Sequence, residues 1–321
     1  MKQKICVVGA GIWGENHIRT LNELGCLGAI VDSSDSALSK FSNHGDIALF
    51  DDIEKALSDN SFDGFIVATP PSTHYELAKK ILICKKPVLV EKPLSLDYKH
   101  SKELVDIAIK NRLNLMVGHV LLFHPAIIKI KELIQSGKIG TLQYIYSNRL
   151  NLGKIRQNEN VFWSLAPHDI SIFQYLVESF PSDVIVNGSI FLQRNIHDLT
   201  ITQLKYPNGV EGHIFLSWIH PFKEHRIVIV GSDGMISFED SEKNKPLKFY
   251  SKKIKLDHNI ANIIDEGYKL IKYDPSLPLT NQLKFFLENL STEMKDPSSM
   301  KSILDISKIL SEASDQLKKN N

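Results

Sequence analysis

The sequence predicts an α/β protein of two domains, in which a doubly wound parallel sheet precedes an α+β domain with a mostly antiparallel open sheet. Three observations predict this architecture. Aliphatic runs alternate with helical patterns up to about residue 118, a glycine-rich turn joins the first run to the first helical pattern, and beyond residue 118 strand-like segments follow one another across short turns. Because 321 residues exceed the usual size of one domain, we divide the chain into residues 1–118 and residues 119–321.

The first domain opens directly on a strand and then alternates strands with helices. Six segments have the composition of buried strands: residues 4–8, 27–31, 47–49, 64–68, 87–90 and 114–117. Five helical patterns separate them: residues 13–24, 35–43, 52–57, 73–84 and 97–111. Parallel strands need crossover connections of this length, and the helices then cover both faces of the sheet. The pattern therefore predicts a parallel sheet that is buried on both faces.

The second domain is predicted to begin with a helix at residues 125–135 and to continue with a mostly antiparallel sheet. Its strands are residues 142–148, 184–192, 199–206, 212–218, 226–230 and 235–238. Turn sequences at residues 207–209 (PNG) and 232–234 (SDG) connect neighbouring strands, as in hairpins.

Three helices complete the predicted second half of the chain. One at residues 167–177 interrupts the strands, and two at residues 281–290 and 299–317 end the chain, where they can pack back on the first domain. The lysine-rich residues 242–255 are interpreted as a solvated surface segment.

The composition argues against a polyanionic partner, a membrane span or a disulfide framework. The 38 Lys and Arg residues are interleaved with 37 Asp and Glu residues, so we expect no nucleic-acid partner. No apolar stretch approaches about 18 residues and no signal-peptide pattern precedes the first strand, so we expect a cytoplasmic protein without membrane contact. Cys6, Cys26 and Cys84 lack CxxC spacing, which favours buried thiols over disulfides or zinc ligands.

The glycine-rich turn has the pattern GxGxxG and lies between the first strand and the first helix. Gly9 permits the tight turn, Gly11 lets the backbone approach a pyrophosphate, and Gly14 allows close packing of helix and strand. Ile12 and Trp13 begin the helix, whose free N–H groups attract an anion. A turn in this context predicts a bound dinucleotide. A fortuitous glycine loop is the alternative.

An acidic residue at the end of the second strand supports the dinucleotide. Asp32 follows Gly9 by 23 residues, where a carboxylate can accept hydrogen bonds from both ribose hydroxyls. Its charge repels a 2′-phosphate, and Ser33 and Ser34 follow it without an arginine. NAD is therefore favoured over NADP, although the serine hydroxyls can still bind a phosphate.

Three further segments occur with the glycine turn. Residues 68–74 (ATPPSTH) follow the fourth predicted strand, residues 91–93 (EKP) follow the fifth, and residues 168–169 (HD) lie in the second half. Together these motifs resemble the Gfo/Idh/MocA oxidoreductase family, and the resemblance covers essentially the whole chain. Residues 149–156 and 163–169 look most like members that act on sugars, often nucleotide-linked ones. The resemblance implies a Rossmann domain that binds NAD, hydride transfer without a metal, and a homodimer or homotetramer.

The resemblance also implies which residues line the cofactor pocket: Thr69, Pro70, His74, Glu91 and Lys92. Pro93 disfavours the helical conformation at Lys92, so this lysine stays extended at the carboxyl end of the sheet, with the peptide between them implied to be cis. There the Lys92 amine can hydrogen-bond a substrate hydroxyl and stabilise the negative charge that develops on its oxygen. A solvated surface lysine is the alternative.

His168 is implied to be the general base. Because Pro167 suits the first turn of a helix, we expect His168 near the positive end of a helix dipole, which opposes protonation of the imidazole. A neutral imidazole can take the proton of an alcohol. A histidine that only packs at a helix start is the alternative, and Asp169 either orients the site or caps the helix.

One position departs from the family pattern. Members commonly carry Asp four residues before the histidine, where this chain has Ser164. Serine passes on a hydrogen bond but holds no negative charge, so Tyr146 or His119 can share the proton transfer. A structural role for His119 is the alternative.

Cationic side chains follow the strand predicted at residues 142–148. Arg149, Lys154 and Arg156 flank a glycine, and Trp163 follows them. Arginine binds phosphate in a bidentate manner and an aromatic ring stacks on a base, so these residues can hold a diphosphate-linked sugar. A solvated cationic loop is the alternative.

The hypothesis is an NAD-dependent enzyme that oxidises a secondary hydroxyl of a sugar, by resemblance a nucleotide sugar oxidised at position 3. His168 takes the proton and Lys92 holds the oxygen. The expected substrate contacts are His119, Tyr146, Arg149, Arg156, Trp163, Ser164 and Asp169. Two alternatives stay open: a free polyol or cyclitol dehydrogenase, which does not need the cationic loop, and a non-catalytic NAD-binding sensor, which Ser164 suggests.

Overall fold

The computed structural model of the chain describes residues 3–43, 45, 47–157, 159–258, 260–291 and 299–319. The chain divides into two compact units. Unit 1 consists of Met1–Phe123 and Leu277–Lys308, and unit 2 consists of His124–Ser276 and Ile309–Asn321. The last helix, α9 (Met300–Lys319), belongs to unit 1 up to Lys308 and to unit 2 from Ile309 onward.

Unit 1 contains the predicted doubly wound parallel sheet. Its strands are β1 (Ile5–Val8), β2 (Leu27–Val31), β3 (Ala48–Phe50), β4 (Gly64–Val67), β5 (Val88–Val90) and β6 (Leu115–Val117). Their order is β3-β2-β1-β4-β5-β6, and all neighbouring pairs are parallel. The strand order reverses at β1 and β4, which is the position where doubly wound sheets bind their ligands. The predicted fold class is confirmed.

Helices fill the connections of this sheet: α1 (Ile12–Leu24), α2 (Asp35–Leu38), α3 (Ile53–Asp59), α4 (His74–Ile83) and α5 (Tyr98–Asn111). Helix α8 (Pro278–Glu288) comes much later in the chain, after β14, and packs on α1. Polar side chains start several of them, because the first N–H groups of a helix have no partner within it. Asp52 and Asp97 accept such N–H groups at the starts of α3 and α5. Strands β1, β4, β5 and β6 are buried on both faces as expected, whereas the edge strand β3 is half-buried.

The cysteines differ in burial. Cys6 lies in β1 and Cys26 precedes β2, and both thiols are buried without a disulfide. Cys84 is exposed, because it ends α4 on the surface instead of pointing into the sheet. The expectation of three buried thiols is therefore wrong for Cys84.

Unit 2 contains an eight-stranded sheet. Its strands are β7 (Leu142–Leu152), β8 (Asp183–Ser189), β9 (Leu199–Lys205), β10 (Glu211–Ser217), β11 (Ile219–Gly231), β12 (Met235–Glu239), β13 (Leu247–Asp257) and β14 (Ile260–Leu270). Their order is β14-β13-β12-β11-β7-β10-β9-β8, and β7 with β10 form the one parallel pair among them. The sheet is thus mostly antiparallel, as predicted.

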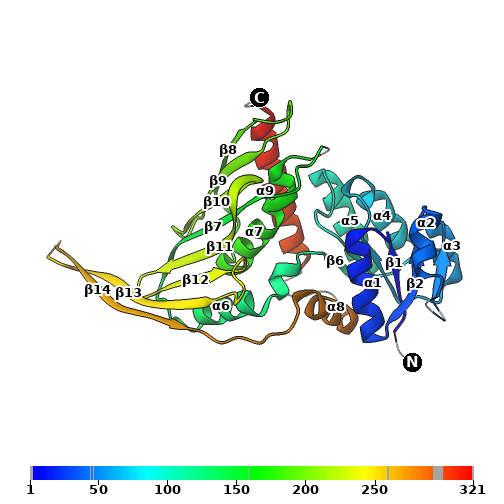
Figure 1. The fold of residues 1–321 in the computed structure, drawn as a ribbon, viewed down its shortest axis with the longest axis horizontal. Coiled ribbons are helices and arrows are strands. Elements are labelled where there is room, and N and C mark those ends of the chain that lie inside the picture. Colours follow the sequence, from blue (N-terminus) through cyan, green and yellow to red (C-terminus); the bar gives the residue numbers. More distant parts are fainter. Residues whose placement is uncertain are drawn as a thin grey trace. The chain divides into compact units, whose positions relative to one another are not determined.

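The two faces of this sheet differ. Helix α7 (Val161–Val177) packs on β7, β9 and β10, and helix α6 (Pro125–Gln135) packs against α7 (Figure 1). In β7, Ile145 and Ser147 are buried on the helix side, whereas Tyr144 and Tyr146 alternate with them on the other face and are half-buried. An antiparallel sheet commonly buries one face only.

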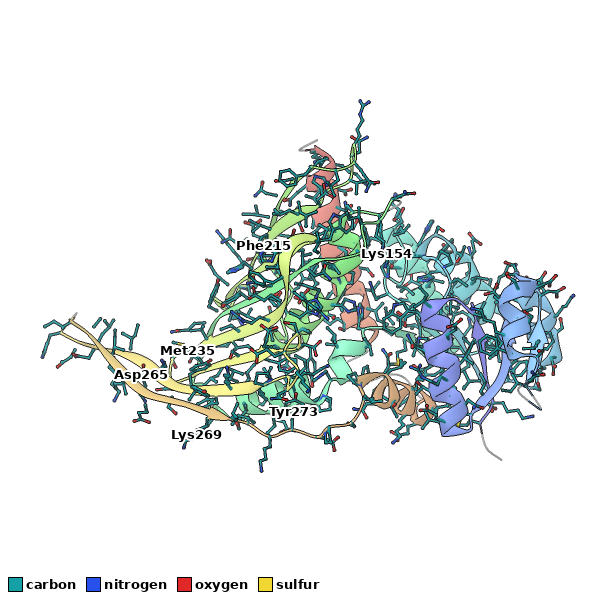
Figure 2. All side chains as sticks on the ribbon, in the orientation of Figure 1. Lys154, Phe215, Met235, Asp265, Lys269 and Tyr273 are labelled. Carbon is teal, nitrogen blue, oxygen red and sulfur yellow. The ribbon has the colours of Figure 1, made fainter. Side chains whose placement is uncertain are left out.

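Residues 242–255 are largely a surface segment, as expected, but they contain a strand that was not predicted. Most of them belong to β13, which pairs with β14 in a long hairpin, on which Figure 2 labels Asp265 and Lys269. Leu247 and Phe249 are buried, while Lys252 forms an ion pair of 2.8 Å with Asp265 of β14. Buried and half-buried residues alternate only at the start of β13. The far end of the hairpin is exposed on both faces, so lysines occur there on both faces and the alternation typical of a strand is not visible in the sequence.

Helix α7 begins six residues earlier than predicted. The Asn160 side chain accepts the Trp163 N–H at 3.0 Å and so starts the helix, and Pro167 lies inside it. Proline suits a first helical turn but is tolerated inside a helix at a cost of about 3 kcal/mol. His168 is therefore in the middle of α7. The predicted position of His168 at a positive helix end is wrong.

Candidate active site

The glycine turn of unit 1 is built by close backbone contacts. Gly9 has φ +101°, and a Cβ there would lie 2.8 Å from the Ala68 carbonyl oxygen. A Cβ on Gly14 would lie 1.9 Å from the Gly9 carbonyl oxygen. Only glycine fits either position, because the first requires a positive φ and the second leaves no space for a methyl group. The turn thus joins β1, α1 and the end of β4.

The start of α1 is open where an anion would bind. Gly11 precedes the helix in an extended conformation, no side chain caps the helix, and a Cβ on Gly11 would have no atom within 4 Å. Ile12 and Trp13 are 78% and 45% exposed. Uncapped N–H groups at a helix start attract phosphate. The turn therefore fits the pyrophosphate of a dinucleotide.

The Asp32 carboxylate faces the same turn. It accepts the Ala10 N–H at 2.7 Å with Oδ2 and the Ser34 N–H at 2.9 Å with Oδ1. These two bonds fix its orientation, and each carboxylate oxygen retains a further acceptor site. Asp32 can therefore accept hydrogen bonds from ribose hydroxyls, which fits the adenosine end of NAD.

His74 connects the two loops that follow β4 and β5. Its Nδ1 lies 2.7 Å from the Pro93 carbonyl oxygen and its Nε2 lies 2.9 Å from the Thr69 carbonyl oxygen, and the ring is buried. The Lys92–Pro93 peptide is cis. His74 therefore acts on the pocket through the two backbone segments, whereas Thr69 is half-buried and Pro70 is exposed.

Glu91 is buried instead of lining an open pocket. Its Oε1 lies 2.7 Å from Nε2 of His17 in α1, and its Oε2 accepts the Lys92 N–H at 3.2 Å. Burial raises the pKa of Glu91, but the hydrogen bond and charge of His17 and the charge of Lys92 outweigh it, so the pKa lies below its ordinary value. A carboxylate at this position is therefore ionised, and His17 donates to it.

His17 was missed by the sequence analysis. The available signal was its place on the buried face of α1, three residues after Gly14 and four before Leu21, where an apolar residue is expected. A polar side chain on such a face needs a buried partner, and Glu91 is that partner.

His119 follows β6 at the same sheet edge and is buried. Burial lowers its pKa to about 4; the Glu91 charge opposes this change and the Lys92 charge adds to it. Its Nδ1 has no hydrogen-bond partner among the described residues. The imidazole is therefore neutral near pH 7.

In unit 2, Arg149 and Asp169 bind each other. Nε and Nη2 of Arg149 donate to the two carboxylate oxygens of Asp169 at 2.8 and 3.0 Å, and both residues are buried. Burial lowers the pKa of Arg149, but the charge of Asp169 and its hydrogen bond to Arg149 raise the pKa by more than burial lowers it. The pKa of Arg149 therefore lies above its ordinary value. The bidentate pair ties β7 to α7.

The remaining candidates of unit 2 occupy different surfaces. Ser164 and His168 are one turn apart and so lie on the same face of α7, Ser164 buried and His168 half-buried. The Trp163 indole donates to Oγ of Ser314 in α9 at 3.0 Å. Tyr146 lies on the sheet face opposite Arg149, stacked on His213 at 5.1 Å.

The cationic loop after β7 is exposed at Lys154, which Figure 2 labels, and at Arg156. Nε of Arg156 lies 3.5 Å from Oε1 of Glu159. The backbone carbonyl oxygen of Arg156 accepts a hydrogen bond from the side-chain amide of Gln193 at 2.9 Å. The second bond connects this loop to the one that follows β8.

The described part of the chain contains neither a membrane-spanning helix nor a metal-binding cluster. No helix in it is long and apolar enough to span a membrane. The described side chains include no group of three or more His, Cys, Asp or Glu residues that could hold a metal ion.

Two family models match the chain. The model described as an oxidoreductase family with an NAD-binding Rossmann fold matches residues 3–119, and the model of the GFO/IDH/MocA C-terminal domain matches residues 127–237. The two matches lie in sequence order and cover most of both units.

Curated relatives include an uncharacterized oxidoreductase of Streptococcus pneumoniae, 27% identical over 58% of this chain and 55% of its own length. The NAD-dependent scyllo-inositol 2-dehydrogenase of Bacillus subtilis is also 27% identical, over 58% of each chain. For these two relatives the match spans little more than half of their length. The UDP-N-acetylglucosamine 3-dehydrogenase of Acidithiobacillus ferrooxidans is 25% identical over 84% of this chain and 83% of its own. Its solved structure has a TM-score of 0.85 at 20% identity and covers 98% of this chain and 97% of that one.

Proposed function

Since the chain belongs to the Gfo/Idh/MocA family of NAD-binding oxidoreductases, we propose that it is an NAD-dependent dehydrogenase of a sugar hydroxyl. One observation carries this proposal. The glycine turn, Asp32, Lys92 and His119 follow β1, β2, β5 and β6 of one parallel sheet, so all four lie at its carboxyl edge. Doubly wound sheets bind dinucleotides at this edge.

The glycine turn and Asp32 hold the cofactor. The N–H groups at the start of α1 bind the pyrophosphate, and Asp32 accepts the ribose hydroxyls, which favours NAD over NADP. When bound, NAD supplies the acceptor of a hydride.

Lys92 and His168 act on the substrate hydroxyl. The Lys92 ammonium holds the oxygen and stabilises the negative charge that develops on it, and the His168 imidazole takes its proton. In the reverse direction the same groups return the proton to a ketone. The middle of a helix gives His168 no help from the helix dipole, so its function as a base depends on its half-buried position and on neighbours such as Ser164.

The substrate is a nucleotide-linked sugar, with position 3 as the first position to test. The exposed Lys154 and Arg156 can bind a diphosphate, and a relative that matches most of the chain is named as a UDP-N-acetylglucosamine 3-dehydrogenase. Trp163 and His119 stay candidate substrate contacts. We assign Arg149 and Asp169 to the support of α7, because they bind each other, and we leave Tyr146 out of the site, because it lies on the opposite sheet face.

A free cyclitol dehydrogenase is the second candidate, because a scyllo-inositol 2-dehydrogenase is among the relatives. The open face of the sheet in unit 2 also carries half-buried and exposed apolar side chains, including Ile201, Phe215 and Tyr146, so we expect a homodimer or homotetramer. Light scattering would measure that assembly.

The test follows the absorbance of NADH at 340 nm with UDP-N-acetylglucosamine or scyllo-inositol as substrate. Lys92→Met and His168→Ala are each expected to lower kcat by about a hundredfold or more while NAD still binds. Turnover of the nucleotide sugar alone supports the first candidate, and turnover of the cyclitol alone supports the second. NAD binding without turnover of any sugar would instead indicate a sensor.

A further inference from the structure

The side chains of His17 and Glu91, the residue directly before Lys92, form a buried pair that has no part in the proposed reaction. His17 is fully buried in α1, and its Nε2 donates to Glu91 Oε1 at 2.7 Å. Glu91 is 7% exposed. A buried carboxylate costs several kcal/mol unless it is paired, so a chain that keeps Glu91 ionised in this place needs the His17 donor.

The other oxygen of the carboxylate acts on the next residue. Glu91 Oε2 accepts the Lys92 N–H at 3.2 Å, and the Glu91 N–H itself is held by the Val67 carbonyl oxygen at 2.8 Å. Glu91 is thus fixed at its backbone by β4, at one oxygen by α1 and at the other by the Lys92 amide. The direction in which the Lys92 side chain leaves the strand depends on this arrangement.

Gly118, at the end of β6, completes the enclosure of the carboxylate. A Cβ on Gly118 would lie 2.9 Å from Cδ and from Oε2 of Glu91. The absence of a side chain at residue 118 is therefore what lets the Glu91 carboxylate lie beside the Lys92 amide.

We propose that the His17–Glu91 pair is a positioning device for Lys92, which rests on the role proposed above for that lysine. The pair holds the Lys92 backbone and keeps one fixed negative charge near its ammonium, so that the lysine stays protonated and directed at the substrate oxygen. His17 and Glu91 are positioning residues, because they act through Lys92. Glu91 is then not the direct cofactor contact that the sequence suggested.

The charged groups of this region come from several elements. His17 comes from α1, Glu91 and Lys92 follow β5, and His119 follows β6. The charge of Glu91 raises the pKa of His119 and that of Lys92 lowers it. The charges of His17 and Lys92 both lower the pKa of Glu91. His119 is neutral near pH 7, so Glu91 is the carboxylate among these groups that favours a protonated Lys92.

The decisive test measures the titration of Lys92 directly, without a substrate. The lysines of the full-length protein are reductively methylated with ¹³C-formaldehyde and a hydride reductant. The Lys92 signal is identified by its loss in Lys92→Arg, and the pKa of Lys92 is followed by NMR. We expect Glu91→Gln to lower the pKa of Lys92 by about 1. Glu103→Gln, which removes a surface carboxylate paired with Lys79 in the same unit, is the matched control and should leave Lys92 unchanged.

Two histidine variants test the donor. His17→Leu removes it and is expected to lower the Lys92 pKa and to reduce kcat about tenfold, while His17→Gln keeps an N–H near the Nε2 position and restores most of both. The Kd for NAD should stay within about threefold in both variants, since a positioning residue of Lys92 does not bind the cofactor. Gly118→Ala displaces the Glu91 carboxylate but keeps its charge, and it replaces Glu91→Gln as the test variant if that protein does not fold. We expect Gly118→Ala to reduce kcat as well.

The two hypotheses fail in different ways. An unchanged Lys92 titration in Glu91→Gln, or an equal loss of activity in His17→Leu and His17→Gln, would overturn the positioning role. A wild-type protein that oxidises neither UDP-N-acetylglucosamine nor scyllo-inositol would count against the proposed reaction, and the NMR titration would still decide the role of the pair.

Discussion

The two glycines on either side of the start of α1 should respond to the same substitution in opposite ways. Gly11→Ala adds a methyl group where no atom lies within 4 Å, in an extended backbone conformation that alanine adopts freely. Alanine is a poorer helix cap than glycine by some tenths of a kcal/mol, but it also restricts the unfolded chain by a similar amount. We therefore expect the free energy of unfolding to change by less than about 0.5 kcal/mol.

The same methyl group lies where the pyrophosphate would approach the backbone. Because the second glycine of this motif is required for that approach, we expect Gly11→Ala to raise the Kd for NAD about 30-fold or more, which is roughly 2 kcal/mol. Gly14→Ala places its Cβ 1.9 Å from the Gly9 carbonyl oxygen, so helix and strand must separate. Overpacking of this kind costs about 1–3 kcal/mol and lowers Tm by about 3–10 °C.

The assay combines thermal melts without NAD and calorimetric titration with NAD on the same three proteins. Gly11→Ala should melt like the wild type and bind NAD weakly, whereas Gly14→Ala should melt earlier. Wild-type NAD affinity in Gly11→Ala would refute the placement of the pyrophosphate. A Gly14→Ala protein as stable as Gly11→Ala would refute the packing that we describe for the turn.

Three further outcomes follow from the described side chains. Asp32→Ala should weaken NAD about tenfold and bring the Kd for NADP close to that for NAD, because the carboxylate no longer accepts the ribose hydroxyls or repels a 2′-phosphate; unchanged Kd values by calorimetry would contradict this. Burial holds the pKa of His119 at about 4, below the 6.5 of an unfolded histidine. Its contribution to stability is therefore complete above pH 6.5 and is lost as the pH falls toward 4, so His119→Gln should show a shallower loss of stability between pH 7 and 4.5 in urea unfolding; equal slopes would argue against it. Arg149→Met or Asp169→Asn alone should cost about 3–5 kcal/mol, and the double variant less than the sum, because each single change leaves a buried charge unpaired; additive losses would count against the ion pair.

Unit 1 was predictable because its signals are local. The run from Ile5 to Val8, the glycines that follow it and Asp32 each have one physical reason for their residue type, and these reasons agree with one another. Buried parallel strands also consist of nearly continuous apolar residues. The alternation of strands and helices, the parallel sheet and the place of the dinucleotide motif could therefore be predicted from the sequence.

Unit 2 was predicted in outline, and its errors have physical causes. Pro167 indicated a helix start because proline is frequent there, whereas the start is made by the side chain of Asn160, seven residues earlier. The lysines of β13 concealed a strand because the far end of the hairpin is exposed on both faces, so that only Leu247 and Phe249 form a buried apolar face.

The pairing of side chains that are far apart in the chain could not be predicted from the sequence. Arg149 and Asp169 both had the chemistry of substrate contacts, and only the structure shows that they satisfy each other. His17 carried one signal, a polar residue on an apolar helix face, but its partner Glu91 is 74 residues away. Neither pair follows from spacing.

A crystal structure of the protein soaked with NAD tests the central claim most directly. We expect the pyrophosphate on the N–H groups at the start of α1, the adenosine ribose on Asp32, and the nicotinamide ring beside Lys92. NAD bound away from the turn between β1 and α1, or with its nicotinamide far from Lys92, would contradict the proposed dehydrogenase.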